Sequence, residues 1–334
     1  MNVKAGKPTG LVAATFTPLS EQGEINLSQI KPYVAYLIEK QSVKRVFVNG
    51  TTGEGMSLSV KERKALAEEW CHQGNNRLEQ VIVHVGCMSL KDSQELARHA
   101  VTTGAHGIAV ISPSFLKPSS VDSLKLYLKE VAMAAPSLPF YYYHLPAVTG
   151  VNLAARDVLE GIEKQIPSFR GVKFSGTDLL DLGLCVSYCP AHWSVLYGVD
   201  EQLLGGLAMG ACGAVGSTYN YIGLINNKML ALFEGGDLTT AREIEELADM
   251  IKTGVVFYDA GFSLQFKIQA VMSDLFKLGF DLPMNKQLMS EVSGINLGPP
   301  RLPLQPCDPL PIATSALSLQ RLHHILDSSS GQKS

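Results

Sequence analysis

Phe140-Tyr-Tyr-Tyr143 and Gly171-Val-Lys-Phe174 are two short apolar runs that lie about 30 residues apart, which is the length of one strand plus one helix. Six similar runs recur along the first two-thirds of the chain. They are Leu11-Val-Ala-Ala-Thr-Phe16, Arg45-Val-Phe-Val48, Val81-Ile-Val-His-Val85, Gly107-Ile-Ala-Val-Ile111, Ser194-Val-Leu-Tyr197 and Gly213-Ala-Val-Gly216. The regular spacing predicts eight repeats of a strand followed by a helix.

The segments between these runs carry helical spacing and helix start signals. Asn26-Leu-Ser-Gln29 and Ser59-Val-Lys-Glu62 both have the pattern of a capping box. Continuous apolar strands that alternate with amphipathic helices are typical of a parallel sheet buried on both faces. Eight such strands favour a closed (β/α)8 barrel, the TIM barrel of the α/β class, over an open doubly wound sheet.

The rest of the chain has a different pattern. We expect the catalytic barrel to span residues 8–222, and residues 223–298 to form a helical C-terminal extension because no strand-like run returns there. Residues 299–311 contain six prolines. We therefore expect residues 299–334 to form an extended segment and a flexible tail.

Composition excludes several classes of partner. The net charge of −3 gives no global reason to expect nucleic acid or an anionic membrane. No stretch approaches the roughly 18 apolar residues of a membrane span, and the first residues do not resemble a signal peptide. Six cysteines in 334 residues are too few for a disulfide scaffold, and neither they nor the histidines show metal-ligand spacing. We expect a cytoplasmic protein that acts on a small molecule without a metal.

In such a barrel the active site lies at the carboxyl ends of the strands. Lys173 is the most informative residue there, because it lies between Val172 and Phe174 in a strand that should be buried on both faces. A buried ammonium without a partner is costly, and a lowered pKa would leave a neutral amine that can attack a ketone to form an imine. The alternative is a lysine whose stem covers apolar surface while its head reaches solvent.

Two other motifs end strands in an unusual way. Gly50-Thr-Thr-Gly-Glu54 matches no nucleotide-binding loop. Its hydroxyls and backbone N–H groups suit a carboxylate, although a tight strand-to-helix turn would use the same residues. Tyr143, in Tyr143-His-Leu-Pro146, is either a general acid–base or an interior aromatic residue.

Taken together and in this order, Thr-Thr-Gly-Glu, Tyr-x-x-Pro and Gly-x-Lys resemble the superfamily of Schiff-base aldolases that contains N-acetylneuraminate lyase and dihydrodipicolinate synthase. The resemblance covers the chain from Gly10 to about Arg301. The stretches Phe140–Gly150 and Gly198–Leu204 are most similar to the N-acetylneuraminate lyase branch, in its vertebrate form.

The resemblance implies cleavage of N-acetylneuraminate to pyruvate and N-acetylmannosamine, with no cofactor, by a homotetramer. It implies that Lys173 forms the imine, that Tyr143 relays the proton of the hydroxyl next to the breaking bond, and that Ser175 lies near that hydroxyl. The substrate carboxylate would be held by Thr51 and Thr52. The polyol tail and sugar hydroxyls would be bound by Gly198, Asp200, Glu201 and Ser217.

Two departures from the superfamily pattern are informative. Val148 occupies the position of an arginine that binds the second substrate in dihydrodipicolinate synthases, which weakens the synthase interpretation. Phe115 stands where many relatives place a tyrosine that enters a neighbouring subunit's site. Two alternatives stay open: an aldolase for a shorter 2-keto acid such as 4-hydroxy-2-oxoglutarate, and a catalytically silent barrel that binds a small molecule.

Overall fold

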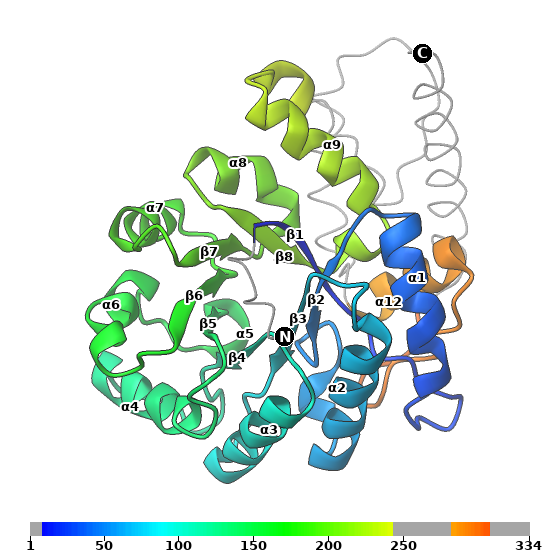
Figure 1. Cartoon of the computed structure of the whole chain (residues 1–334), viewed down its shortest axis with the longest axis horizontal. Helices are drawn as coiled ribbons and strands as arrows, with labels where there is room; N and C mark the ends of the chain where they lie inside the picture. The colour runs from blue at the N-terminus through cyan, green and yellow to red at the C-terminus, as the bar shows by residue number, and fades with distance from the viewer. Residues whose placement is uncertain (1–8, 243–281, 308–334) are drawn as a thin grey trace.

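The computed structural model describes residues 9–242 and 282–307. Eight parallel strands pair in chain order and close into a barrel through β1 and β8 (Figure 1). The strands are β1 (Gly10–Ala14), β2 (Arg45–Val48), β3 (Gln80–His84), β4 (Gly107–Ile111), β5 (Phe140–His144), β6 (Phe169–Phe174), β7 (Ser194–Tyr197) and β8 (Gly213–Gly216). The predicted (β/α)8 barrel is confirmed, and each predicted run overlaps a strand.

Helices surround the barrel between successive strands. They are α1 (Ile30–Glu39), α2 (Val60–Gly74), α3 (Leu90–Thr102), α4 (Val121–Ala132), α5 (Pro146–Thr149), α6 (Ala155–Leu159), α7 (Leu179–Tyr188) and α8 (Leu203–Ala208). Short 3-10 helices occupy η1 (Leu27–Gln29), η2 (Gly55–Ser57), η3 (Ile162–Lys164), η4 (Asp200–Gln202) and η5 (Thr218–Asn220). The chain therefore alternates strand and helix as its period predicts.

The two predicted capping boxes have different outcomes. Ser59 and Glu62 cap α2 reciprocally, side chain to backbone, as predicted. The Asn26 box is wrong, because the Asn26 side chain caps no backbone N–H and instead accepts a hydrogen bond from Ser28 Oγ. The chain there forms η1, and α1 begins only at Ile30.

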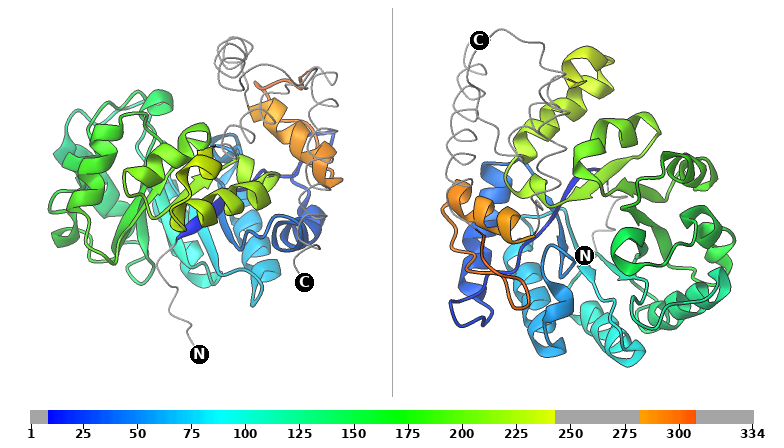
Figure 2. Two further views of the ribbon diagram at one scale, coloured as in Figure 1. Left: turned by 90° about the horizontal axis from the view of Figure 1, so that it is seen from above. Right: turned by 180° about the vertical axis from the view of Figure 1, so that it is seen from behind.

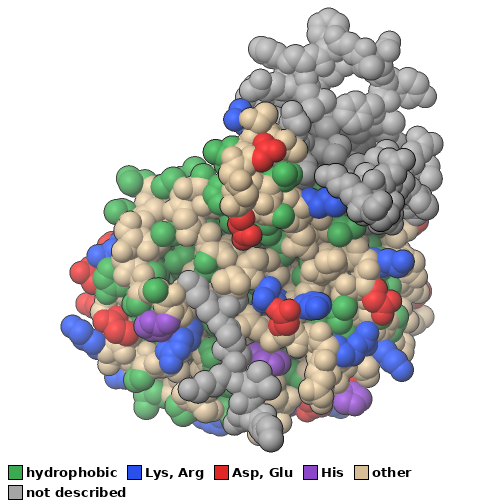
Figure 3. All heavy atoms as spheres, turned by 45° about the horizontal axis from the view of Figure 1, so that its top comes forward, with side chains coloured by type: hydrophobic (Ala, Val, Ile, Leu, Met, Phe, Trp, Pro, Cys, Tyr) green, Lys and Arg blue, Asp and Glu red, His purple; other side chains and the backbone are tan. Residues whose placement is uncertain are grey.

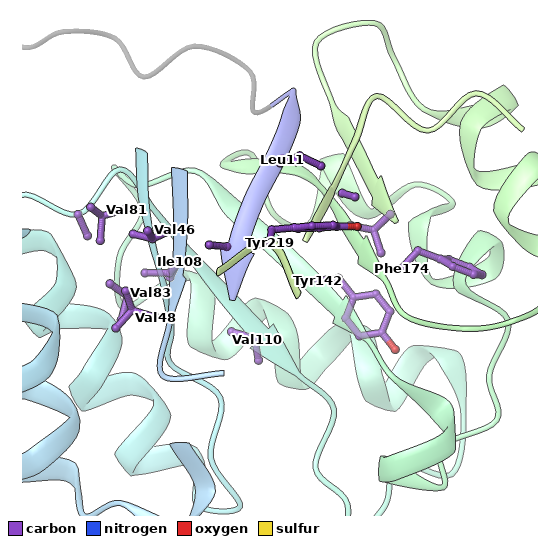
Figure 4. Close-up of a cluster of buried hydrophobic side chains, with 14 of the residues drawn as sticks. Leu11, Val46, Val48, Val81, Val83, Ile108, Val110, Tyr142, Phe174 and Tyr219 are labelled. Atoms are coloured by element: carbon purple, nitrogen blue, oxygen red, sulfur yellow. The ribbon is translucent and has the colours of Figure 1, made fainter. Parts of the chain in front are cut away.

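The core has two layers, one on each side of the barrel wall. Side chains that face outward from the strands, such as Val46, Val83 and Tyr142, pack against the helices (Figure 4). The strand residues that alternate with these, such as Phe47 and Tyr143, face inward and fill the barrel. This period of two means that Lys173, which pairs in register with Tyr143 and Leu196, faces the barrel interior.

Two helices of the C-terminal extension are described, α9 (Gly223–Glu234) and α12 (Leu282–Ser293). Figures 1 and 2 place α12 beside α1, and its Leu288 and Met289 join the outer core. The helical extension is thus confirmed in these two helices. Residues 243–281 of the extension and residues 308–334 of the tail lie outside the described part.

On the face shown in Figure 3, basic and acidic side chains are interspersed among polar and apolar ones. Within residues 9–242 and 282–307, no helix combines the length and the hydrophobicity that a membrane span requires.

Candidate active site

Lys173 extends from β6 into the barrel and is only 5% exposed. Its Nζ lies 4.0 Å from the centroid of the Tyr143 ring and 4.3 Å from that of Phe47. No side chain or carbonyl in the described part of the chain forms a hydrogen bond or an ion pair with this amine. The geometry agrees with a buried lysine whose nitrogen is free to react and not with a head that reaches solvent.

A one-residue bulge between β5 and β6 gives Lys173 this direction. Phe140 pairs with Phe169, but the next residue, Tyr141, pairs with Gly171, so Arg170 is the extra residue in β6. Without that insertion the in-and-out alternation from Phe169 would turn Lys173 outward, because a slip of one residue reverses every side chain.

The turn after β2 brings Thr51 to Tyr143. The two side-chain oxygens, Thr51 Oγ1 and Tyr143 Oη, lie 3.1 Å apart. The turn is tightly wound, since Glu54 N–H donates to Thr51 O and Gly55 N–H donates to Gly50 O. Thr51 is exposed and Thr52 is half-buried, and both follow the carboxyl end of β2.

Ser175 and Gly198 meet on the other side of the mouth. A Cβ on Gly198 would lie 2.0 Å from Ser175 Oγ, so a side chain at position 198 would displace that hydroxyl. Ser175 is 8% exposed, and its Oγ finds no hydrogen-bond partner among the described residues. A buried hydroxyl without a protein partner is costly unless a ligand or water satisfies it.

The carboxylate of Asp200, after β7, is held in place by Thr218, after β8. Asp200 Oδ2 accepts hydrogen bonds from both the backbone N–H and the hydroxyl of Thr218, at 2.9 and 2.7 Å. A Cβ on Gly216 would lie 2.0 Å from Asp200 Oδ1. Glu201 lies beside Asp200 on η4, and Ser217 follows β8. The structure thus places all the predicted binding residues at the carboxyl ends of β2, β6, β7 and β8.

Three residues near the site belong to none of the motifs found in the sequence. Phe47 lies against Lys173, and the ring of His84 meets that of Tyr143 edge-on at 5.9 Å. Thr218 anchors Asp200. The alternation of β2 could have placed Phe47 inside the barrel, whereas the partners of His84 and Thr218 depend on contacts between strands.

His84 lies in an environment that favours its neutral form. Burial, helped by the nearby charge of Arg63, lowers the pKa of His84 well below its usual value. His84 Nδ1 lies 3.0 Å from the carbonyl oxygen of Asn49, which is the geometry of an N–H donor to that oxygen. The imidazole therefore stabilises the backbone at Asn49, where the turn after β2 begins.

Among residues 9–242 and 282–307, no group of three His, Cys, Asp or Glu side chains is placed to hold a metal ion. The arrangement instead combines one buried amine, one phenol with a hydroxyl neighbour, and several hydroxyl and carboxylate groups around the mouth. This set suits covalent chemistry at a carbonyl group together with binding of a polyhydroxylated molecule.

Comparison with known proteins identifies the family. The model of the Dihydrodipicolinate synthetase family matches residues 7–258. The chain belongs to this family. It is 58% identical to N-acetylneuraminate lyase of Danio rerio over 97% of this chain and 98% of the relative. It is 55% identical to N-acetylneuraminate lyase of Homo sapiens over 90% and 88%, respectively.

Solved structures of family members agree with this assignment. N-acetylneuraminate lyase (sialic acid aldolase) from Aliivibrio salmonicida superposes with a TM-score of 0.82 at 37% identity, covering 94% of this chain and 97% of that one. Proteus mirabilis N-acetylneuraminate lyase superposes with a TM-score of 0.81 at 33% identity, covering 95% and 99%.

Proposed function

We propose that this protein is a Schiff-base aldolase that cleaves N-acetylneuraminate to pyruvate and N-acetylmannosamine. The observation that carries the proposal is the amine of Lys173, buried inside the barrel against the rings of Tyr143 and Phe47. Family membership and high identity to N-acetylneuraminate lyases support the choice of substrate.

The first step joins Lys173 to the open-chain form of the sugar. Nζ attacks the keto carbon, and loss of one water leaves a protonated imine. The positive nitrogen then draws the electron pair of the bond between the carbons α and β to the imine carbon. This bond breaks as the imine becomes an enamine. Protonation of the enamine carbon and addition of water release pyruvate and restore the lysine.

Tyr143 relays the proton in bond cleavage. The hydroxyl next to the breaking bond loses its proton as it becomes the aldehyde of N-acetylmannosamine. Because Thr51 Oγ1 lies 3.1 Å from Tyr143 Oη, the phenol can accept this proton on one side while it donates its own on the other. A hydroxyl pair of this kind serves as both acceptor and donor.

The remaining groups hold the substrate at its two ends. Thr51 and Thr52 bind the carboxylate through hydroxyls and backbone N–H groups, which suit an anion. The unpartnered Ser175 Oγ faces the reacting hydroxyl. Gly198, Asp200, Glu201 and Ser217 contact the polyol tail, where the fixed carboxylate of Asp200 accepts hydrogen bonds from sugar hydroxyls.

We infer a homotetramer in the cytoplasm. Soluble oligomers are mostly homo-oligomers with closed symmetry. Apolar side chains on the surface, including Phe115 at 85% and Leu180 at 70% exposure, offer area that a second copy would cover. The inferred organisation remains a barrel over residues 8–222, a helical extension over 223–298, and an extended segment with a tail over 299–334.

Borohydride reduction in the presence of pyruvate tests the chemistry. The reduced imine should add the mass of the pyruvate-derived group to the peptide that contains Lys173. Cleavage of N-acetylneuraminate, compared with cleavage of 4-hydroxy-2-oxoglutarate, tests the substrate. No adduct at Lys173, or faster cleavage of the short keto acid, would contradict the proposal.

A further inference from the structure

Glu54 belongs to the threonine turn by sequence, but its carboxylate points to another part of the molecule. Glu54 Oε1 accepts a hydrogen bond from Lys286 Nζ at 2.7 Å, and Oε2 accepts one from the backbone N–H of Arg301 at 2.7 Å. The ion pair is buried, with side-chain exposures of 1% for Lys286 and 2% for Glu54. Lys286 also donates to Pro299 O at 3.0 Å.

The backbone of the turn at Glu54 is strained. Glu54 has φ of 54°, in the left-handed region that residues with a side chain rarely adopt. Directly after it, a Cβ on Gly55 would lie 2.0 Å from Asn49 O. A conformation of this kind persists only where its surroundings impose it. Local hydrogen bonds hold the Glu54 backbone, and its side chain is held by Lys286 and Arg301, more than 230 residues later in the chain.

Another residue of the same turn contacts Tyr143. Thr51, three residues before Glu54, touches Tyr143 through its hydroxyl. Glu54 N–H donates to Thr51 O at 3.0 Å, so the two residues share one hydrogen-bonded turn. A shift of Glu54 would therefore be transmitted to Thr51 and its hydroxyl.

We propose that Lys286 is a positioning residue that holds Glu54, and through it the Thr51–Thr52 turn, in the geometry that binds the carboxylate of the 2-keto acid. The inference rests on the proposed function, since it assumes that this turn binds a carboxylate. It assigns a role in substrate binding to α12, a helix that contributes no side chain to the barrel interior in the described structure.

The test compares inhibition by the two products. Pyruvate carries the carboxylate that the turn would bind, whereas N-acetylmannosamine has none. In Lys286→Met the inhibition constant for pyruvate and the KM for N-acetylneuraminate should both rise about tenfold, because small misplacements of binding groups have effects of this size. The inhibition constant for N-acetylmannosamine should change by less than about twofold, whereas kcat should also fall, because the displaced Thr51 hydroxyl is the partner of Tyr143.

Lys125→Met is the matched control. Lys125 is another buried lysine, whose Nζ donates to Glu160 O at 2.6 Å, far from the turn in sequence and in contacts. It should leave both inhibition constants as in the parent protein. An equal rise for both products in Lys286→Met, or a rise for neither, would overturn the positioning role and leave the proposed function intact.

A second variant covers the case in which Lys286→Met does not fold, since it leaves a buried carboxylate without its partner. The double variant Glu54→Gln/Lys286→Met removes both charges and keeps an acceptor for Arg301 N–H. It should fold and show at least about a threefold rise in the pyruvate constant alone. Unchanged pyruvate inhibition in the double variant would refute the inference. A parent protein that does not cleave N-acetylneuraminate would remove both proposals.

Discussion

Lys173 has two aromatic rings as its nearest partners, so the surroundings of its amine are apolar on the side of Phe47 and Tyr143. Lys173→Ala removes the only nucleophile that the mechanism uses. We expect cleavage of N-acetylneuraminate to fall by roughly 10³-fold or more and the borohydride adduct to disappear, both measured on purified protein.

Lys164→Ala is the control for this loss. Lys164 lies on η3 and is exposed, so its removal should preserve turnover and the adduct. Substantial turnover in Lys173→Ala would show that another group forms the covalent intermediate.

Tyr143→Phe keeps the ring over Lys173 but removes the phenolic oxygen that faces Thr51. General acid–base groups contribute about 10²–10⁴-fold, so kcat should fall by at least about 10²-fold. Trapping of pyruvate at Lys173 should continue, because the amine is still present. Tyr142→Phe, on the outward face of the same strand, is the matched control and should retain most of kcat. A Tyr143→Phe enzyme with full kcat would exclude the relay.

The candidate site is only partly readable from the sequence. Lys173 and Tyr143 can be predicted because each ends or interrupts an apolar run, and strand ends converge at one face of a barrel. The direction of Glu54 cannot, because the motif gives no sign that this carboxylate pairs with Lys286 instead of facing the substrate. Such a pairing depends on how the C-terminal extension packs.

At the scale of elements, β6 shows how a local irregularity determines which side chains face the site. Its bulge at Arg170 turns Gly171, Lys173 and Ser175 inward. Gly171 has φ of 146°, and a Cβ there would lie 1.9 Å from the backbone oxygen of Ser194 on β7. Only glycine permits β7 to approach β6 this closely.

Gly171→Ala should therefore destabilise the barrel. Forcing a methyl group into this contact costs about 1–3 kcal/mol or more, and urea unfolding should move to a lower midpoint. Gly205→Ala is the control, because Gly205 lies in α8 with no atom within 4 Å of the added Cβ. That variant should be neutral or slightly stabilised. Equal midpoints for Gly171→Ala and the parent would contradict the close approach of these strands.

The positions of the strands follow from the sequence because the apolar runs recur at one period, and β2, β4, β7 and β8 have the predicted bounds. The bulge does not follow, because Phe169 and Arg170 fall outside the predicted run of β6 and their register depends on pairing with β5. The Asn26 box fails for a similar reason. Its side chain finds a partner nearer than the helix, in Ser28.

At the scale of the whole molecule, stability should depend on pH through buried histidines. Burial lowers the pKa of His144, between the strands and α7, to about 4 from its usual 6.5. The unfolded chain therefore binds an extra proton between these values, so stability should fall as pH decreases from about 6.5 toward 4 and lose up to about 3 kcal/mol from this group.

His144→Phe keeps an aromatic ring against Phe174 and removes the titrating group. Unfolding midpoints measured across this pH range should decline less steeply in the variant than in the parent. Parallel declines would mean that His144 does not contribute to acid destabilisation.

The hydrogen bonds that hold the Glu54 carboxylate join residues far apart in the chain, so the ribosome synthesises them at different times. The barrel itself can close once β8 meets β1, at residue 216, but the partners of Glu54 follow only at residues 286 and 301. A nascent polypeptide that has released all eight strands would thus still carry an unpaired acidic side chain behind its threonines. The turn would therefore reach the geometry that we propose for carboxylate binding only after α12 has been synthesised and has docked.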